Sequence, residues 1–388
     1  MYLRYLSQAL VALGHEVTVI SGPPYPQLVE GVALVKLPSL DLYARPLSSV
    51  TFADLKDRLG RREWISKLTG GFVEPWTFAE RAREWLLRHA SEFDVIHDNQ
   101  TLADGILDLQ RAGLPVIATV HHPITRDLRV ALASEPRWWW RLLIRRWHSF
   151  LGMQASVARQ LSHIVTVSRL SATDIATDFG VMPAVLKVIP NGVDTALFRP
   201  LPEVARQSNQ IIATASADAP LKGLSTLLHA VGKLTQKRPE LRLVLIARPK
   251  PGGDTERVID ALGLAERIQF VGGATHEEIN QLYAESAAAV VPSLYEGFGL
   301  PAVEAMSAGI PLISSDGGAL AEVVGEGGLL VPAGDSEALA AGLQRVLSDA
   351  DLARELSNRG LRRARQQFCW SVCAQQMVDE YRACISRC

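Results

Sequence analysis

Cysteine and long apolar runs are scarce in this chain of 388 residues, and its charges nearly cancel. All four cysteines lie after residue 368 with no histidine nearby, which predicts reduced thiols on a helix rather than a metal site. No apolar run approaches the ~20 residues that span a bilayer, and the start lacks the basic region and cleavage site of a signal peptide. We therefore expect a cytoplasmic protein. The net charge of -1 argues against nucleic acid as a partner.

The length and the pattern of apolar residues predict two domains of the α/β class. A single core usually stops growing at roughly 250 to 300 residues, fewer than this chain contains. Short β-branched runs alternate with longer amphipathic stretches, which is typical of doubly wound, Rossmann-like domains with parallel sheets. The expected strands cover residues 16–20, 32–37, 94–97, 116–120 and 163–167 in the first half, and 211–214, 242–246, 268–271, 288–291, 311–314 and 328–331 in the second.

Turn-forming residues and prolines between positions 189 and 202 mark the expected boundary between the domains. We place it near residue 195, so that residues 1–195 form the first domain and residues 196–367 the second. Residues 368–388 are expected to form a helix that packs back on the first domain. A cleft between two domains is the default place for a ligand.

The start of the chain departs from the usual order of a doubly wound domain. Such a domain opens with a central strand, yet residues 2–13 already have the pattern of the first helix, which ends at Gly14. Either residues precede Met1 in the native protein, or the first sheet lacks its middle strand. We favour the first explanation, because an empty central position would leave strand edges unpaired in a buried sheet.

The most informative segment covers residues 292–311, which follow an expected strand and run into an expected helix. Gly297 and Gly299 allow the backbone to approach a ligand. The amides at the start of the helix would then face a diphosphate, because the helix dipole favours anions there. Glu296 and Glu304 flank this turn and can accept hydrogen bonds from sugar hydroxyls. The alternative is a plain strand-to-helix turn with solvated carboxylates.

This segment resembles the motif of retaining glycosyltransferase family 4. The resemblance rests on two glutamates eight positions apart that enclose G-F-G-L-P, followed by E-A-M-S-A-G-I-P. It implies the GT-B fold, in which two Rossmann-like domains face an interdomain cleft. Further agreement lies in residues 190–194 with Phe198, 221–223, 315–322, 328–332 with 334–335, and in Phe368 and Trp370.

The resemblance implies retaining transfer of a sugar from a nucleotide-diphosphate sugar to an acceptor that the sequence does not identify: a glycan, a small molecule or a lipid-linked sugar. The nucleotide sugar is a co-substrate, and no other cofactor is expected. The chain shows no Asp-x-Asp pair of the kind that holds a metal in the other common glycosyltransferase fold, so we expect no metal. The implied site residues are His121, Lys222 and Glu296 as catalytic, Phe298, Gly299, Leu300, Glu304 and Arg248 as donor-binding, and Asn99 and His122 on the acceptor side.

Two of these roles depend on charge near the donor phosphates. By the resemblance, Lys222 contacts the phosphates, where a cation stabilises the leaving nucleoside diphosphate; alone, a lysine before a glycine is more typical of a surface charge. The family usually has an arginine five residues earlier, and here that position is Ala217. Arg248 and Lys250, beyond the next strand, either supply the missing charge or are solvated surface residues.

On the acceptor side, His121 and His122 end an expected strand in the run A-T-V-H-H-P. By resemblance to the family's strand-end histidine, His121 reaches the transferred sugar, and an imidazole suits this because it holds either protonation state near neutral pH. The alternative is a histidine that satisfies local backbone groups. Asn99 lies at another strand end and is expected to help bind the acceptor.

The stretch from Arg137 to His148 contains four tryptophans and four arginines. Arg137, Arg141 and Arg145 line one helical face, and apolar residues share another. Such a helix either lies on an anionic membrane at the inner face of the cell or packs its apolar face on the sheet. We favour packing on the sheet, and membrane contact stays the alternative.

Two other functions are compatible with the same fold, because fold does not determine function. A sugar-nucleotide epimerase would need acids or bases around the donor sugar, and the paired glutamates favour transfer instead. A catalytically impaired sugar-nucleotide-binding protein is supported by Ala217 and by the unusual start of the chain.

Overall fold

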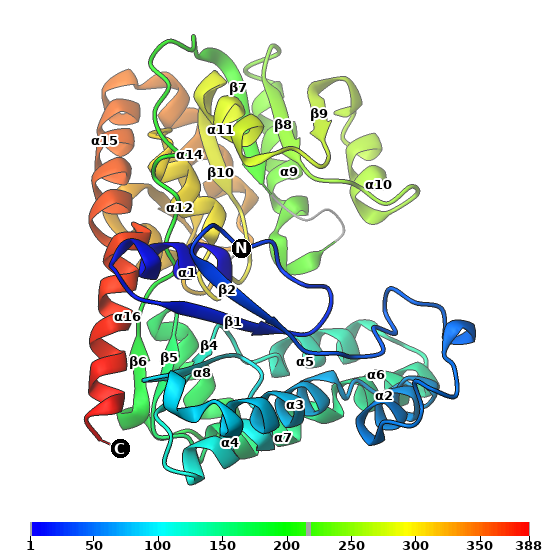
Figure 1. Cartoon of the computed structure of the whole chain (residues 1–388). Helices are drawn as coiled ribbons and strands as arrows, with labels where there is room; N and C mark the ends of the chain where they lie inside the picture. Colours follow the sequence, from blue (N-terminus) through cyan, green and yellow to red (C-terminus); the bar gives the residue numbers. More distant parts are fainter. Residues whose placement is uncertain (1, 215–218, 388) are drawn as a thin grey trace. The chain divides into compact units, whose positions relative to one another are not determined.

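A computed structural model describes residues 2–214 and 219–387, and its contacts divide the chain into two compact units (Figure 1). The first unit comprises Met1–Val167, Ser171–Ile189 and Ala374–Cys388. The second comprises Ser168–Leu170 and Pro190–Cys373. The division after Ile189 precedes the expected boundary near residue 195, because the turn that follows already bonds within the second unit: the Val193 amide donates to the Phe368 carbonyl at 2.6 Å.

The strands of the first unit form two separate parallel sheets. Val116–Val120 is buried at all five positions, as expected of a strand covered on both faces. No strand within the described part of the chain joins the two sheets. The four-stranded sheet has the order β3 (Ile96–Asn99), β4 (Val116–Val120), β5 (Ile164–Thr166) and β6 (Leu186–Val188), and the two-stranded sheet pairs β1 (Val17–Ser21) with β2 (Val32–Lys36).

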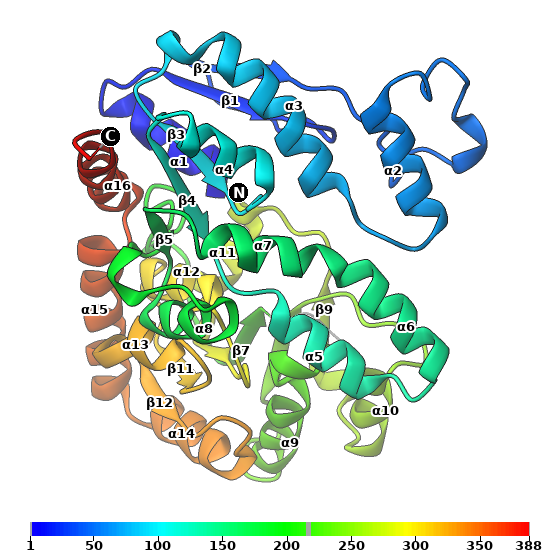
Figure 2. The same cartoon turned by 90° about the horizontal axis from the view of Figure 1, so that it is seen from below.

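Helices cover the sheets of the first unit, and the first of them, α1 (Tyr2–Ala12), confirms the expected opening helix. Helices α3 and α4 lie side by side (Figures 1 and 2). A Cβ at Gly105 of α4 would lie 2.5 Å from the Ala79 carbonyl oxygen of α3, so only glycine permits this approach. The other helices are α2 (Arg58–Leu68), α3 (Glu74–Arg88), α4 (Asp104–Arg111), α5 (Thr125–Ser134), α6 (Trp138–Trp147), α7 (Leu151–Ala158) and α8 (Arg169–Phe179).

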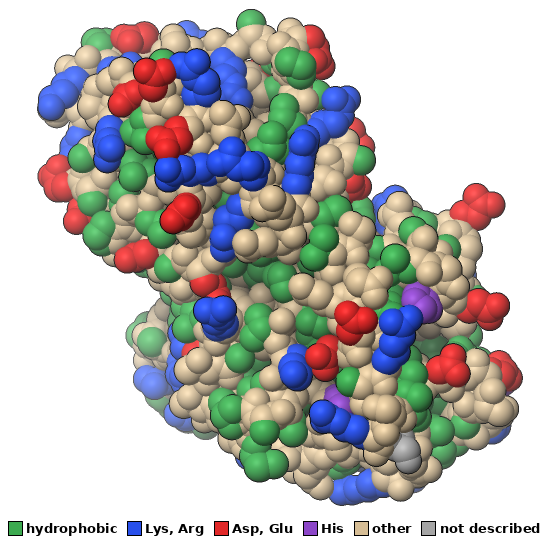
Figure 3. Space-filling model, turned by 90° about the vertical axis from the view of Figure 1, so that its left-hand side faces the viewer, with side chains coloured by type: hydrophobic (Ala, Val, Ile, Leu, Met, Phe, Trp, Pro, Cys, Tyr) green, Lys and Arg blue, Asp and Glu red, His purple; other side chains and the backbone are tan. Residues whose placement is uncertain are grey.

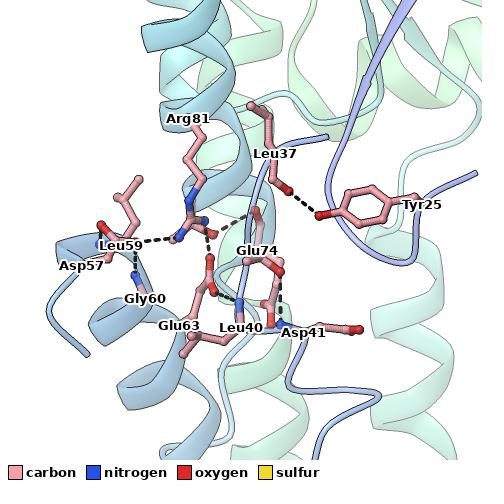
Figure 4. A network of polar contacts seen from close by, with 12 residues as sticks. Tyr25, Leu37, Leu40, Asp41, Asp57, Leu59, Gly60, Glu63, Glu74 and Arg81 are labelled. Atoms are coloured by element: carbon pink, nitrogen blue, oxygen red, sulfur yellow. Dashed lines mark hydrogen bonds and ion pairs between the residues drawn. The ribbon is translucent and has the colours of Figure 1, made fainter. Parts of the chain in front are cut away.

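A polar network joins α2 to α3 (Figure 4). Asp57 caps α2 by accepting the amides of Leu59 and Gly60, and it also pairs with Arg81 of α3 at 2.9 Å. Arg81 pairs in addition with Glu63, a buried carboxylate that accepts the Leu40 amide at 2.8 Å. The buried charge is thus compensated from two sides, as burial requires.

The second unit is a doubly wound sheet of six parallel strands in the order β12-β11-β10-β7-β8-β9. The direction of winding reverses between β7 and β10, and ligands of such sheets bind beyond the carboxyl ends of the strands at this point. The strands are β7 (Gln207–Thr214), β8 (Arg242–Ile246), β9 (Ile268–Val271), β10 (Ser286–Val291), β11 (Leu312–Ser315) and β12 (Leu329–Val331). The helices are α9 (Leu224–Thr235), α10 (Asp254–Ala261), α11 (His276–Glu285), α12 (Leu300–Ser307), α13 (Leu320–Val324), α14 (Ser336–Ser348) and α15 (Ala350–Gln367).

The last helix, α16 (Trp370–Ile385), begins in the second unit and belongs to the first from Ala374 onward. There, the Tyr381 hydroxyl is hydrogen-bonded to Nδ1 of His97 at 2.7 Å. Cys369, Cys373 and Cys384 are not joined in disulfide bonds, and Cys388 lies outside the described residues.

Charges of both signs mix on the face of the molecule drawn in Figure 3. This face shows Lys and Arg side chains interspersed with Asp and Glu, in keeping with the net charge of -1. Within residues 2–214 and 219–387, none of the helices is long and apolar enough to cross a membrane.

Candidate active site

The loop between β10 and α12 contains the paired-glutamate motif. Its last residue, Gly299, has a left-handed backbone (φ 94°), and a Cβ there would lie 2.5 Å from Cδ2 of Leu320. Glycine is therefore required to turn the chain into α12, and Pro301 fits the first turn because its missing N–H needs no acceptor there. The turn presents the start of α12 at the carboxyl end of β10, where an α-helix leaves amides without internal acceptors.

A second loop, which follows β7, is bonded directly to this one. The Leu294 amide donates to the Leu221 carbonyl at 2.8 Å. Gly223 also has a left-handed backbone (φ 63°), and a Cβ there would lie only 1.9 Å from the Pro292 carbonyl oxygen. Glycine at position 223 is thus needed to bring the two loops into contact, at the point between β7 and β10 where the winding of the sheet reverses.

This contact brings Lys222 and Glu296 together across 74 positions of sequence. Nζ of Lys222 lies 2.8 Å from Oε1 of Glu296, and the Ser293 hydroxyl donates to the same oxygen at 2.8 Å. The Glu296 side chain is mostly buried, whereas a third of the Lys222 side chain is exposed. Sequence reasoning found both members of the ion pair but missed Ser293, because a serine after a strand has no distinguishing pattern.

The turn after β11 fixes the backbone of Glu296. The Ala319 amide donates to the Glu296 carbonyl at 2.8 Å. Gly318 is left-handed (φ 69°), and a Cβ there would lie 2.4 Å from the same carbonyl oxygen. The glycine at position 318 of the D-G-G-A sequence therefore allows this turn to pack against the loop of Glu296.

Glu304, on α12, is the second glutamate of the motif and is 9% exposed. Burial raises the pKa of its carboxyl to about 7, since the charged form loses hydration. The nearby Tyr283 hydroxyl, itself buried, has a pKa raised by burial and by the Glu304 charge. A carboxylate in this environment gains more from a ligand hydroxyl than a solvated one does.

The other residues predicted to bind the donor differ in whether their backbone or their side chain can reach a ligand. The Phe298 ring is buried edge-on against Phe368, with centroids 5.7 Å apart, so only the Phe298 backbone can face a ligand. Arg248 follows β8 and lies against Gly272 and Gly273. The approach is so close that a Cβ at Gly272 would lie 2.6 Å from the Arg248 Cγ. Ala217 lies outside the described residues.

The acceptor-side candidates lie in the first unit, at the carboxyl ends of β3 and β4. Nε2 of His121 is hydrogen-bonded to Oδ1 of Asn99 at 2.9 Å, so Asn99 contacts the candidate catalytic histidine itself. Burial first, and His122 second, lower the pKa of His121 to about 4. His121 is therefore neutral at pH 7. Nε2 of His122 faces Oδ2 of Asp127 at 3.2 Å.

Comparison with known proteins decides the family. The sequence matches the model described as Glycosyltransferase Family 4 over residues 1–197 and the model described as Glycosyl transferases group 1 over residues 202–363. The chain belongs to glycosyltransferase family 4. Its two parallel-sheet units and its paired-glutamate loop therefore belong to a GT-B transferase, and the epimerase interpretation is not supported.

One sequence relative and two solved structures are similar to this chain over most of its length. The MMP alpha-(1->4)-mannosyltransferase of Mycolicibacterium hassiacum is 46% identical over 394 residues, which cover 100% of this chain and 95% of the relative. The sucrose-phosphate synthase of Thermosynechococcus elongatus shares the fold with a TM-score of 0.75 at 24% identity, covering 100% of this chain and 93% of that one. HepE of Anabaena, solved with UDP, has a TM-score of 0.63 at 22% identity and covers 78% and 82% of the two chains.

Metal independence of the transferase stays a prediction. An Asp-x-Asp sequence does occur at Asp349–Asp351, but both carboxylates have other partners. Asp349 caps α15 by accepting the Asp351 and Leu352 amides, and Asp351 pairs with Arg354. This sequence is thus part of a helix start.

Proposed function

We propose that the transferase moves a hexose, with retention of anomeric configuration, from a nucleotide-diphosphate sugar bound by its second unit. The observation behind this proposal is that three groups lie near the point between β7 and β10 where the strand order of the sheet reverses. These groups are the Lys222–Glu296 ion pair, the start of α12 and the buried Glu304 carboxyl. Such a set offers a cation and amides to a diphosphate and carboxylates to sugar hydroxyls.

In this proposal, the donor phosphates lie on the backbone amides of Phe298, Gly299 and Leu300 and draw Lys222 toward them. The leaving nucleoside diphosphate gains negative charge as the glycosidic bond breaks, and a fixed cation with aligned amides stabilises that charge. Glu296, relieved of its lysine, accepts hydroxyls of the transferred sugar, and Glu304 accepts the ribose hydroxyls. Arg248 supplies the second cation that the family usually has at position 217.

The acceptor is proposed to meet the first unit near His121. A histidine with a pKa of about 4 is uncharged at neutral pH, so His121 acts by hydrogen bonding to the transferred sugar. We expect departure and attack on the same face of the sugar, with the protein orienting both reactants. Asn99 and His122 complete the acceptor side.

Mannose is the sugar we propose for transfer, because the relative that is 46% identical over the whole chain is a mannosyltransferase. A screen of GDP-, UDP- and ADP-sugars for nucleoside diphosphate release, with and without a mannoside acceptor, tests this. We expect a mannosyl donor to exceed every glucosyl donor by about tenfold or more in kcat/KM. Release only from non-mannosyl donors would overturn the choice of sugar, and no release from any donor would overturn the transferase activity.

We also propose that the stretch from Arg137 to His148 contacts an anionic membrane. Helix α6 has no buried residue, contrary to the expectation that it packs on the sheet. Trp138 is 72% exposed, and Trp139, Leu142 and Leu143 are exposed as well. At the end of α6, Trp147 stacks on Phe72, with ring centroids 5.0 Å apart.

Helix α6 contacts the residue that follows α2, and exposed apolar side chains also occur on α2 and in the segment before it. Arg146 donates to the Thr69 hydroxyl, just after α2, at 3.0 Å. Ile65 and Leu68 of α2 are exposed, and Phe52 is 92% exposed. Tryptophan suits the interface of a bilayer and arginine its anionic headgroups, so a membrane surface matches both features.

Sedimentation with phosphatidylglycerol vesicles tests the membrane proposal. We expect most of the protein to sediment at about 50 mM salt and little at about 500 mM, because salt screens the arginines. Arg141→Gln with Arg145→Gln should weaken binding several-fold, whereas Arg354→Gln, an exposed arginine of the second unit, should not. Absence of sedimentation at low salt, or equal binding to phosphatidylcholine vesicles, would contradict the proposal.

A further inference from the structure

One side chain, that of Gln100, holds the turn that contains His121 and His122. Its Oε1 accepts the His121 amide at 2.7 Å, and its Nε2 donates to the His122 carbonyl at 2.9 Å. The paired register of β3 and β4 ends at Asn99 and Thr119. The Gln100 side chain therefore continues the bonding beyond the end of the ladder and constrains both backbone groups of the turn.

The loop of Gln100 is strained and firmly held. Gln100 and Leu102 have left-handed backbones (φ 63° and 50°), which residues other than glycine rarely adopt. The buried Asp98 accepts the amides of Thr101 and Leu102, and the buried Gln154 donates to the carbonyls of Gln100 and Thr101 at 3.2 Å. Such strain persists only where the surroundings over-determine it, and it concentrates at functional sites.

Residues beside this loop orient the His121 ring. The Asn99 Oδ1 within 2.9 Å of Nε2 can only accept, so Nε2 of the neutral ring bears the proton and Nδ1 is left as an acceptor. The Tyr2 ring lies edge-on against the imidazole, with centroids 4.6 Å apart, and restricts its rotation. The backbone of His121 is thus fixed by Gln100, on the loop after β3, and its ring by Asn99, the last residue of β3, and by Tyr2 of α1.

We propose that Gln100 is a positioning residue for glycosyl transfer, acting by setting the backbone at His121 and His122 and thereby the place where the His121 ring meets the sugar. This inference rests on the proposed function, which gives His121 its role at the transferred sugar. Gln100 itself contacts the histidine backbone through both ends of its amide.

Gln100→Gly separates this role from a structural one. Glycine adopts a φ of 63° without strain, so the variant loses the amide contacts and relieves the backbone. We expect Tm to stay equal or rise, kcat to fall about tenfold or more, and the donor KM to change less than about twofold, as for a misplaced catalytic group. A merely structural glutamine would lower Tm and leave kcat of the folded enzyme unchanged.

A double-mutant cycle with His121→Ala completes the test. If Gln100 acts through His121, Gln100→Gly should cause no further loss of kcat in the His121→Ala background. Gln160→Ala, at an exposed glutamine of the same unit, serves as the matched control and should match wild type in kcat. Independent, multiplying losses or an unchanged kcat in Gln100→Gly would overturn the inference.

Failure of the proposed function is seen separately, as an inactive wild type in the same assay. In that case, NMR of the full chain labelled with 15N-histidine decides the inference without activity. We expect the His121 signal to show a single Nε2–H tautomer in wild type and a mixture of tautomers in Gln100→Gly. Identical tautomer populations in the two proteins would overturn the inference.

Discussion

Lys222→Ala is expected to lower kcat about 100- to 1000-fold, the usual cost of removing a group that stabilises transition-state charge. Its side chain is partly exposed and lies in a loop, so Tm should change by no more than about 2 °C. Glu296→Ala should lose comparable activity, because it removes the other half of the same ion pair. Steady-state transfer rates and thermal melts of the purified variants check both expectations.

Lys233→Ala is the matched control for Lys222→Ala. Lys233 also pairs with a carboxylate of the second unit, Glu337, but this pair is on the exposed surface. We expect its kcat to remain within about twofold of wild type, as for most surface substitutions. A Lys222→Ala enzyme with the same near-normal rate would remove the ion pair from the mechanism.

Glu304→Gln is expected to stabilise the protein and to weaken donor binding. Because burial raises the folded-state pKa to about 7, the folded chain retains a proton that the unfolded chain releases near its ordinary pKa. The unfolded state then binds fewer protons between about pH 4.5 and 7, so stability falls as pH rises through that window, by on the order of 3 kcal/mol for this group. An uncharged glutamine avoids this loss.

Thermal melts at pH 5 and pH 8 measure the effect. The Tm of Glu304→Gln should exceed that of wild type clearly at pH 8 and little at pH 5, while its affinity for the nucleotide sugar by calorimetry should fall about tenfold or more. Glu337→Gln, at an exposed carboxylate, should show neither change. A Tm difference that is the same at both pH values would contradict the assigned burial.

The strands buried on both faces could be predicted almost to the residue. Residues 116–120 and 242–246 coincide with β4 and β8, because parallel strands under helices have nearly continuous apolar runs. The edge strand β6 was missed because two of its three residues, Lys187 and Val188, are exposed and leave no apolar run. Its pairing with β5 depends on tertiary contacts instead.

In the site, too, residues within a sequence motif could be predicted, whereas residues whose role depends on tertiary contacts could not. Both Lys222 and Glu296 could be predicted as candidate site residues from the motifs around them, but their ion pair could not, because it depends on the close approach of two loops that is allowed by glycine at position 223. The role of Gln100 could not be predicted, since a glutamine with a left-handed backbone has no sequence pattern and its partners lie 21 and 22 positions later in the chain. For the tryptophan-rich helix, composition allowed both a buried and an exposed face, and only packing decides between them.

The measurement that tests the central claim most directly is a crystal structure of the full chain with a non-hydrolysable nucleotide-diphosphate sugar. The account predicts the diphosphate on the amides of residues 298–300 with Nζ of Lys222 within hydrogen-bond distance, the ribose hydroxyls on Glu304 and the hexose on Glu296. A donor bound elsewhere, or bound with both glutamate carboxyls turned away from it, would contradict the account.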